Sequence, residues 1–285
     1  REAVRWGELV VGRVGDRALV PELLRSRGIE AVVHFAAFAY VGESVEQPGL
    51  YFQNNVVETL GLLESMREAG VTRIVFSSTC ATYGQPIRLP LDEDHPQAPV
   101  SPYGETKLAV EWMLRAFERA HGLRWIALRY FNAAGAHPDG TLGELHEPET
   151  HLIPSAIFAA LGRRSPLELF GTDYPTADGT AIRDYVHVVD LALAHRLAVE
   201  RLARDEPSIA VNLGTGAGHS VREVLAAVER ATGRPVPRVD RPRRPGDPAS
   251  LVADPSRSRT ALAWIPARSS LDDIVADAYA FLRAR

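Results

Sequence analysis

Short apolar runs alternate with segments of helical periodicity through the first half of the chain. Residues 31–35, 74–78 and 125–131 are apolar runs of the kind that form strands buried on both faces. Residues 50–69 and 103–120 have the pattern of helices, and Gly70 and Gly122 stand where each would end. This alternation predicts an α/β fold, a Rossmann-like doubly wound parallel sheet, with ligands at the carboxyl ends of the strands.

The pattern changes after residue 131. Residues 132–149 form a long loop rich in Gly, Pro and His, and loops of this length tend to be functional. Beyond it we expect strands at 167–170, 185–188 and 209–213, helices at 152–161 and 271–283, helices starting at Asp190 and Ser220, and a basic loop at 238–248. We therefore predict a Rossmann-like domain over 1–131 and a smaller substrate-binding lobe over 132–285, with residues 183–214 returning to the first domain.

Composition restricts the classes of function. The chain has 285 residues and a net charge of −4, so it offers no strongly basic surface for nucleic acid. It has no apolar run long enough to span a bilayer, and its first residues do not form a signal peptide. A single cysteine, Cys80, excludes an internal disulfide framework and a Cys-based zinc site. We expect a cytoplasmic enzyme with no metal. Because the chain begins with Arg1, we expect an upstream segment to be missing.

Lys107 is the one lysine in a chain that otherwise uses arginine for positive charge. It follows Tyr103 by four residues, so on a helix the phenol and the ammonium share a face. An ammonium near a phenol lowers the pKa of the phenol and lets tyrosine take up a proton near neutral pH. The planar guanidinium of arginine suits this task poorly. The simpler interpretation of the spacing is an exposed lysine that happens to follow a tyrosine.

Several motifs together resemble the UDP-glucose 4-epimerases, which belong to the extended short-chain dehydrogenase/reductases. The resemblance runs from residue 1 to about residue 283 and is strongest to the bacterial and plant branch that includes UDP-galactose and UDP-arabinose/xylose 4-epimerases. The motifs are His34 to Ser44, Ser77 to Gly84, Tyr103-x-x-x-Lys107, Arg129 to Asn132, Gly171 to Pro175 and Arg183 to Asp190.

The resemblance implies a reaction. Tyr103, as phenolate, would take the proton of the sugar 4-hydroxyl while the C4 hydride passes to tightly held NAD, and the 4-keto sugar would then turn and receive the hydride on its opposite face. Thr79 would hydrogen-bond the reacting oxygen, although its hydroxyl could instead satisfy backbone. Related dehydratases carry an Asp-Glu pair, and related decarboxylases a Glu, directly after this threonine. Here Cys80 and Ala81 occupy those positions. Cys80 itself is interpreted as a packing residue because no base accompanies it.

The resemblance also implies binding residues. For NAD these are Asn54, Ser77, Tyr103, Lys107 and Tyr130. For the UDP-sugar they are Thr79, Tyr103, Asn132, Phe170, Arg183, Arg244 and Asp247. The arginines suit phosphate, although solvated surface charge is the alternative. His34 and His187 are interpreted as structural. A homodimer through helices 50–69 and 103–120 is the implied assembly.

The departures from the family all concern NAD. No glycine-rich Gly-x-x-Gly-x-x-Gly motif follows a first strand, Arg13 stands where an adenine-contacting Asp is usual, and Ala39 replaces a Lys. Either the chain is a fragment lacking the first strand-helix-strand unit, or it is a shortened, non-catalytic nucleotide-sugar-binding protein that has lost NAD. We favour the fragment, because losing a sheet edge exposes apolar strand 31–35. Leu251, intermediate in size at a substrate-gating position, leaves the sugar pair open.

Overall fold

The computed structural model describes residues 4–244 and 246–285, and contacts within the chain divide it into two compact units. Unit 1 comprises the chain up to Gly84 together with 96–129 and 195–211; unit 2 comprises 85–95, 130–194 and the chain from Asn212 onward. The first three residues of the predicted domain 1–131 lie outside the described residues. That domain assignment stays a prediction; in the structure, residues 85–95 group with unit 2 and the returning segment is 195–211.

A four-stranded sheet organises unit 1. Its order is β1 (Val32–His34), β2 (Arg73–Thr79), β3 (Arg124–Tyr130) and β7 (Ile209–Leu213). β1 and β2 are parallel, with Val33 opposite Val75. Each predicted strand of the first half is present, within one residue of its expected ends, because continuous apolar runs have few other ways to be buried.

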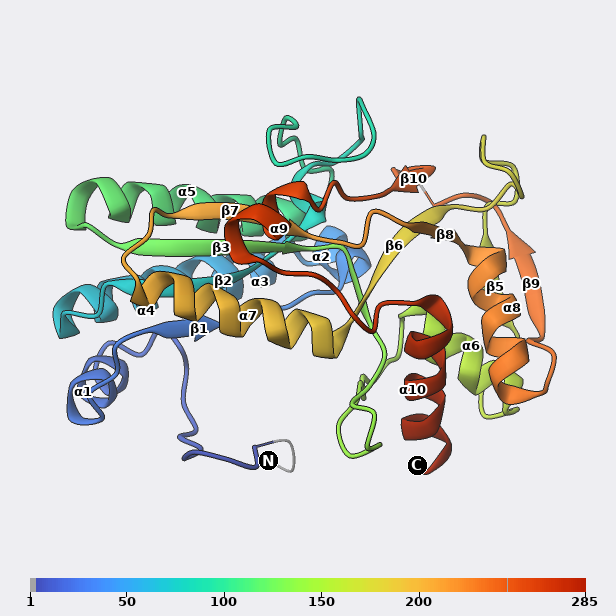
Figure 1. The fold of residues 1–285 in the computed structure, drawn as a ribbon, viewed down its shortest axis with the longest axis horizontal. Helices are drawn as coiled ribbons and strands as arrows, with labels where there is room; N and C mark the ends of the chain where they lie inside the picture. The colour runs from blue at the N-terminus through green and yellow to red at the C-terminus, as the bar shows by residue number, and fades with distance from the viewer. Residues whose placement is uncertain (1–3, 245) are drawn as a thin grey trace. The chain divides into compact units, whose positions relative to one another are not determined.

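Helices α1 (Leu19–Ser26), α2 (Val41–Glu46), α3 (Pro48–Tyr51), α4 (Glu58–Ala69) and α5 (Pro102–His121) accompany this sheet, and α7 (Val188–Ala203) contributes its C-terminal half. Figure 1 shows α5 and α7 running along the strands. The single helix predicted over 50–69 is interrupted by a π-helical segment, η1 (Phe52–Val57). Gly70 and Gly122 end their helices with φ of +76° and +70°, as predicted.

The core of unit 1 lies where α4 and α5 cover the strands. Leu63 and Met66 of α4 pack with Leu114 of α5 and with Ile74 and Phe76 of β2. Amphipathic helices bury their apolar stripe in this way, and the contact fixes α5 relative to the carboxyl end of β2.

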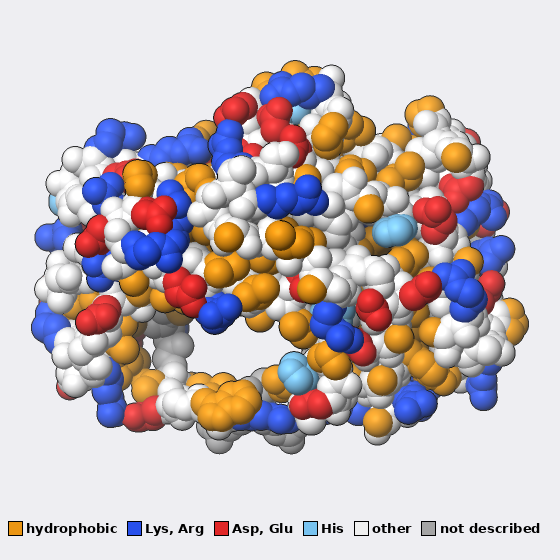
Figure 2. Space-filling model, in the orientation of Figure 1, with side chains coloured by type: hydrophobic (Ala, Val, Ile, Leu, Met, Phe, Trp, Pro, Cys, Tyr) orange, Lys and Arg blue, Asp and Glu red, His pale blue; other side chains and the backbone are white. Residues whose placement is uncertain are grey.

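β1 forms one edge of the sheet, and apolar side chains beside it reach the surface. Val33 is 37% exposed and Phe35 is 59% exposed, although the Phe35 ring lies 4.6 Å from that of His195 on α7. Figure 2 shows hydrophobic side chains at the surface among the charged ones. The exposure predicted for segment 31–35 is therefore present at Val33 and Phe35, whereas His34 between them is buried.

Unit 2 has two small sheets. In the first, β6 (Ile182–His187) pairs with β4 (Asn132–Ala134), β10 (Ser250–Leu251) and, antiparallel, β8 (Gly218–Ser220). In the second, β5 (Leu167–Phe170) pairs with β9 (Arg238–Arg241). The prediction of a loop over 238–248 is thus wrong for its first residues. All four residues of β9 are exposed, so the sequence has no apolar pattern there that would predict a strand. The strand is defined by its pairing with β5.

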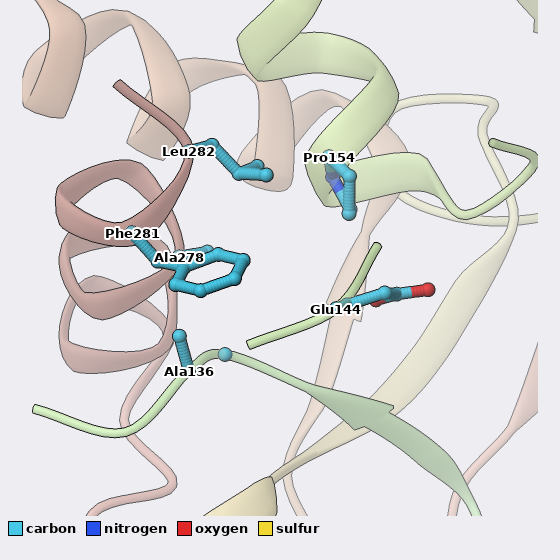
Figure 3. Close-up of a pocket in the computed structure, with 7 residues that line it drawn as sticks. Ala136, Glu144, Pro154, Ala278, Phe281 and Leu282 are labelled. Atoms are coloured by element: carbon cyan, nitrogen blue, oxygen red, sulfur yellow. The ribbon is translucent and has the colours of Figure 1, made fainter. Parts of the chain in front are cut away.

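Three helices form the core of unit 2: α6 (Leu152–Ala160), α8 (Val221–Thr232) and α10 (Leu271–Arg283), with the shorter α9 (Ser256–Leu262) elsewhere in the unit. Ser220 caps α8 as predicted, whereas α7 begins at Val188, two residues before Asp190. Figure 3 shows a small cavity next to this core, with the ring of Phe281 turned toward Pro154. The cavity contains none of the candidate site residues and is lined by Gly135, Ala136, Glu144, Pro154, Ala278, Phe281 and Leu282.

Two glycines of unit 1 allow the cost of a steric clash to be separated from the cost of a left-handed backbone conformation. Gly84 and Gly122 both have positive φ (+69° and +70°), but a Cβ on Gly84 would lie 1.9 Å from the carbonyl oxygen of Ala98, whereas nothing lies within 4 Å at Gly122. Gly122→Ala should cost about 1–2 kcal/mol of unfolding free energy, from left-handed strain alone. Gly84→Ala should cost about 3 kcal/mol or more, because backbone must move as well. Urea denaturation measures both, and equal losses would contradict the packing argument.

Candidate active site

Helix α5 presents the first group of candidate residues. Ser101 caps it, its Oγ accepting from the backbone N–H of Gly104 at 3.2 Å, and Pro102 occupies the first turn. A Cβ on Gly104 would lie 2.6 Å from the carbonyl oxygen of Ala81, so glycine lets the start of α5 approach the turn after β2. Tyr103 and Lys107 lie one helical turn apart and face that turn.

The carboxyl end of β2 supplies the partners of these two side chains. The hydroxyl of Thr79 accepts from the N–H of Ala81 at 3.1 Å, and it lies close enough to the phenol of Tyr103 to lower the pKa of that phenol. Lys107 Nζ donates to the carbonyl oxygen of Ser77 at 2.8 Å. Unit 1 therefore gathers the three residues predicted as catalytic, Thr79, Tyr103 and Lys107, together with the candidate cofactor residue Ser77.

Burial controls the proton affinities of this group. Burial lowers the pKa of Lys107 to about 7. Burial also raises the pKa of Tyr103 to about 12, against the hydrogen bond from Thr79, which lowers it. Lys107 Nζ lies 5.9 Å from the Tyr103 ring centroid and is nearer the Phe76 ring, at 5.0 Å. The expected lowering of the phenol pKa by the ammonium is therefore wrong for the structure as it stands, because desolvation outweighs it.

The remaining NAD candidates are Asn54 in unit 1 and Tyr130 in unit 2. Asn54 is half-buried on η1, and its Nδ2 donates to Asn55 Oδ1 at 3.0 Å. Tyr130 is half-buried at the end of β3 and groups with unit 2. The amide, hydroxyl and ammonium of Asn54, Ser77 and Lys107 are donors suited to the hydroxyl and carboxamide groups of a nicotinamide riboside, so the donor set fits that part of NAD. None of these three residues supplies the glycine-rich loop that binds the phosphates of NAD in the Rossmann fold.

Asn55 is a site-forming residue that the sequence did not reveal. Its side chain accepts from the N–H of Phe38 at 2.8 Å and donates to the carbonyl of Phe38 at 3.0 Å and to Thr106 Oγ1 at 3.1 Å. It therefore ties the segment after β1 to α5 beside Lys107. A polar pair such as Asn54 and Asn55 on a helix gives no signal of which member is buried.

Arg13, the departure from the family at the adenine position, has a partner in the structure. Its guanidinium pairs with Glu58, whose other carboxylate oxygen accepts from the N–H of Gly15 at 3.1 Å. Glu58 thus fixes this segment to the start of α4. The guanidinium remains mostly exposed, so its charge is solvated while it makes this contact.

His34 has the structural role that the sequence suggested. It is buried, and its Nε2 lies 2.9 Å from Thr59 Oγ1. Burial, with the nearby charge of Lys107, lowers the pKa of His34 to about 4. The imidazole is therefore neutral at physiological pH.

The candidate nucleotide-sugar residues are brought together in unit 2. Arg183 Nη2 donates to Asp247 Oδ1 at 2.5 Å, and the Arg244 guanidinium lies 4.1 Å from the Phe170 ring centroid. A turn joins the two pairs, because the N–H of Asp247 donates to the carbonyl of Arg244 at 3.2 Å. A stacked arginine and an arginine–aspartate pair provide an aromatic face, two guanidinium forks and a carboxylate in one place.

Strand β6 positions two further candidates. Leu251 lies opposite Arg183 in the pairing of β10 with β6, and Asn132 lies opposite Tyr185 in the pairing of β4 with β6. Asp184, which the sequence did not single out, is buried behind Arg183 and accepts from the N–H groups of Thr215 and Ala253 at 2.9 and 3.2 Å. It fixes the two loops that border this strand.

One group of described residues has the side chains of a metal site: Glu144, His146, Glu149 and His151, with ligand atoms within 4.8 Å of one another. His146 Nδ1 lies 2.9 Å from Glu144, and His151 pairs with both glutamates. The glutamates raise the pKa of His151 to about 10, so a proton already supplies the positive charge there. We assign no metal to it.

Comparison with known proteins places the chain in a family. Residues 1–214 match the NAD dependent epimerase/dehydratase family. The chain belongs to this family. It is 50% identical over 279 residues to a UDP-glucose 4-epimerase of Rhizobium leguminosarum bv. trifolii, covering 98% of this chain and 85% of that protein, and 47% identical to one of Corynebacterium glutamicum, covering 100% and 85%.

Solved structures agree with the fold. The UDP-glucose 4-epimerase of Brucella ovis in complex with NAD superposes with a TM-score of 0.96 at 52% identity, covering 98% of this chain and 86% of that one. That of Stenotrophomonas maltophila with NAD and formylated UDP-arabinopyranose gives 0.93 at 42% identity, covering 96% and 82%. The predicted Rossmann-type fold and the resemblance to the 4-epimerases are thereby confirmed. No helix among the described residues is long and apolar enough to cross a membrane.

The neutral state of His34 predicts a pH dependence of stability. The unfolded chain binds this proton near pH 6.5 and the folded chain only near pH 4, so the contribution is complete above pH 6.5 and is lost as the pH falls to about 4. The loss should be about 3 kcal/mol. His34→Gln should flatten the curve of unfolding free energy against pH, whereas His121→Gln, an exposed control, should leave its slope unchanged. Parallel curves for wild type and His34→Gln would refute the assignment.

Proposed function

We propose that this chain acts as an NAD-dependent UDP-sugar 4-epimerase of the UDP-glucose/UDP-galactose type. The observation that carries the proposal is the contact of Tyr103 with Thr79 and of Lys107 with Ser77, in a chain whose relatives at about 50% identity are UDP-glucose 4-epimerases. NAD, when bound, would supply the acceptor and donor for the hydride at C4 of the sugar.

Tyr103 is the proposed acid and base. Its phenolic oxygen would take the proton of the 4-hydroxyl as the carbonyl forms and return it afterwards, and Thr79, already bonded to the phenol, would hold the reacting oxygen. Because burial raises the pKa of Tyr103 to about 12 even with Lys107 nearby, further positive charge or hydrogen bonding must stabilise the phenolate before it acts as a base. Lys107, with Asn54, Ser77 and Tyr130, would hold the cofactor.

Unit 2 is the proposed holder of the UDP group. Arg183 and Arg244 would bind the phosphates, Asp247 the ribose hydroxyls and Asn132 the diphosphate, while Phe170 would line the uracil pocket. Arg183 and Asp247 are already paired at 2.5 Å, so each is oriented before substrate arrives, although the pair must open or share its hydrogen bonds.

The alternatives are supported less well. A non-catalytic nucleotide-sugar-binding protein would not need the sole lysine buried against the end of β2, and the relatives are enzymes. Dehydration is disfavoured because Cys80 and Ala81 offer no acid or base beside Thr79. Leu251 is compatible with galactose, arabinose and xylose forms of the substrate, so the sugar pair stays a prediction.

Assembly and location are further parts of the proposal. α4 and α5 expose Leu60 (42%) and Trp112 (59%), apolar side chains suited to pairing of two copies through these helices. A homodimer and a cytoplasmic location remain predictions from the sequence.

Tyr103→Phe tests the chemistry. The variant should lose the acid–base step, and kcat for interconversion of UDP-galactose and UDP-glucose should fall about 10²–10⁴-fold. NAD released by denaturing the purified protein should stay equal to wild type, because the phenol oxygen is not the main cofactor anchor. Wild-type protein with bound NAD and no epimerase activity on UDP-galactose, UDP-arabinose or UDP-xylose would overturn the proposal.

Arg244→Ala tests the nucleotide site against a matched neighbour. Arg244 stacks on Phe170, whereas Arg243 is exposed, pairs with Asp173 and stacks on Tyr174. Losing a charge-assisted contact to phosphate should raise KM about tenfold or more in Arg244→Ala, with a smaller change in kcat. Arg243→Ala should stay within about twofold of wild type. Equal changes in KM for the two substitutions would show that Arg244 does not bind the substrate phosphates.

A further inference from the structure

The face of α5 that carries Tyr103 and Lys107 continues to a third side chain, Glu111. These residues are four apart, so they lie in one row along the helix. Each makes a contact with the end of β2: Tyr103 with Thr79, Lys107 with the carbonyl of Ser77 at 2.8 Å, and Glu111 with the hydroxyl of Ser78, which donates to it at 2.7 Å. Three adjacent residues of β2 thus contact three successive turns of the helix, although the two sets do not follow the same order.

Glu111 is held in place from a third element. Arg129 of β3 binds it bidentately, Nε donating to Oε1 at 2.9 Å and Nη2 to Oε2 at 2.7 Å. The Glu111 side chain is 0% exposed and that of Arg129 is 2% exposed. Burial favours the neutral acid, but the guanidinium outweighs it and lowers the pKa of Glu111. Both groups are therefore charged inside the protein.

The same guanidinium reaches the turn that follows Thr79. Arg129 Nη1 donates to the hydroxyl of Tyr83 at 2.8 Å. Tyr83 is itself buried and comes directly after the turn η2 (Cys80–Thr82). Arg129 thereby fixes the far end of the segment that begins at Thr79, while Glu111 and Ser78 fix its near end.

A buried ion pair contributes little net stability, because desolvation of two charges offsets their attraction. What it supplies is geometry, since a bidentate pair tolerates little sliding or rotation. We propose that Glu111 and Arg129 are a positioning pair that sets the register of α5 on β2 and so holds Tyr103 to Thr79 and Lys107 to Ser77. The catalytic consequence of this inference rests on the proposed epimerase function.

The register matters because neighbouring residues along a helix differ by about 1.5 Å in height. A displacement of about 1 Å is enough to cost about 10²-fold in rate when it moves a reacting group. Without the Glu111–Arg129 pair, the polar contacts that link this face of α5 to β2 among the described residues would be the two made by Tyr103 and Lys107 themselves. The packing of Leu114 against Ile74 and Phe76 would remain, but apolar contacts are not directional and fix the register less closely. The positions of these side chains would then change with each ligand contact.

The test compares Glu111→Gln, Ser78→Ala and the double variant Glu111→Gln/Arg129→Met with the control Glu118→Gln. Glu118 lies on the same helix and accepts from Trp125 Nε1 at 2.9 Å and Ser208 Oγ at 2.6 Å, away from the β2 end. Glu111→Gln removes the negative charge that faces the buried guanidinium of Arg129 and should lose stability. The double variant removes both charges and should recover much of it, and Ser78→Ala should disturb folding least.

The sole lysine supplies a readout that needs no activity. Protein labelled with ¹³C at lysine Cε should give a single signal, which titrates near pH 7 in wild type because Lys107 is buried. In Glu111→Gln and in the double variant, the midpoint should rise toward the ordinary value of lysine as Nζ leaves Ser77. In parallel, kcat should fall about 10²-fold in both with KM little changed. Ser78→Ala should change both quantities in the same direction but less.

The outcomes separate the two proposals. A double variant with recovered stability and a wild-type lysine titration overturns the positioning role, whatever the activity. Glu118→Gln should lose stability while keeping the wild-type lysine signal and kcat. If Glu118→Gln instead changed the lysine titration and kcat as much as Glu111→Gln does, any damage to α5 would have the same effect and the positioning role would be overturned. An inactive wild type whose lysine signal still responds to Glu111→Gln would contradict the epimerase proposal and leave the positioning pair supported.

Discussion

The contact of one face of α5 with the carboxyl end of β2 is the constraint on which unit 1 depends. It requires Gly104 where the helix meets Ala81, a cap at Ser101, and apolar packing of Leu114 against the sheet. It brings Tyr103 to Thr79 and Lys107 to Ser77. The bidentate pair of Glu111 and Arg129 completes the row, so the geometry of the candidate site is determined by residues that do not themselves reach solvent.

Burial sets the charges at this contact. The same desolvation that lowers the pKa of Lys107 to about 7 raises that of Tyr103 to about 12 and keeps His34 neutral. Such perturbed groups are typical of functional sites, where the field of a ligand completes the environment. In the proposed reaction, the phenol of Tyr103 would act as a base only where further favourable charge or hydrogen bonds stabilise its phenolate.

Unit 2 shows a different kind of organisation. Arg183 and Asp247 neutralise each other, Arg244 stacks on Phe170, and Asp184 fixes the bordering loops through backbone N–H groups. Guanidinium and carboxylate groups arranged in this way suit a nucleotide diphosphate and its ribose. The strand β9, which carries the start of this arginine-rich segment, has no apolar side of its own and exists because β5 pairs with it.

The sequence by itself determined the alternation of strands and helices, the ends of α4 and α5 at glycine, and the placement of Tyr103 and Lys107 on one face of α5, because apolar periodicity and four-residue spacing act locally. It also carried the family motifs, which the comparisons bear out. Only the tertiary structure decided that Lys107 is desolvated, that Asn55 rather than Asn54 is buried, that Glu111 meets Arg129, and that residues 238–241 form a strand. Each of these depends on contacts between segments far apart in the chain, and the free energy of a charge or hydrogen bond is set by what surrounds it.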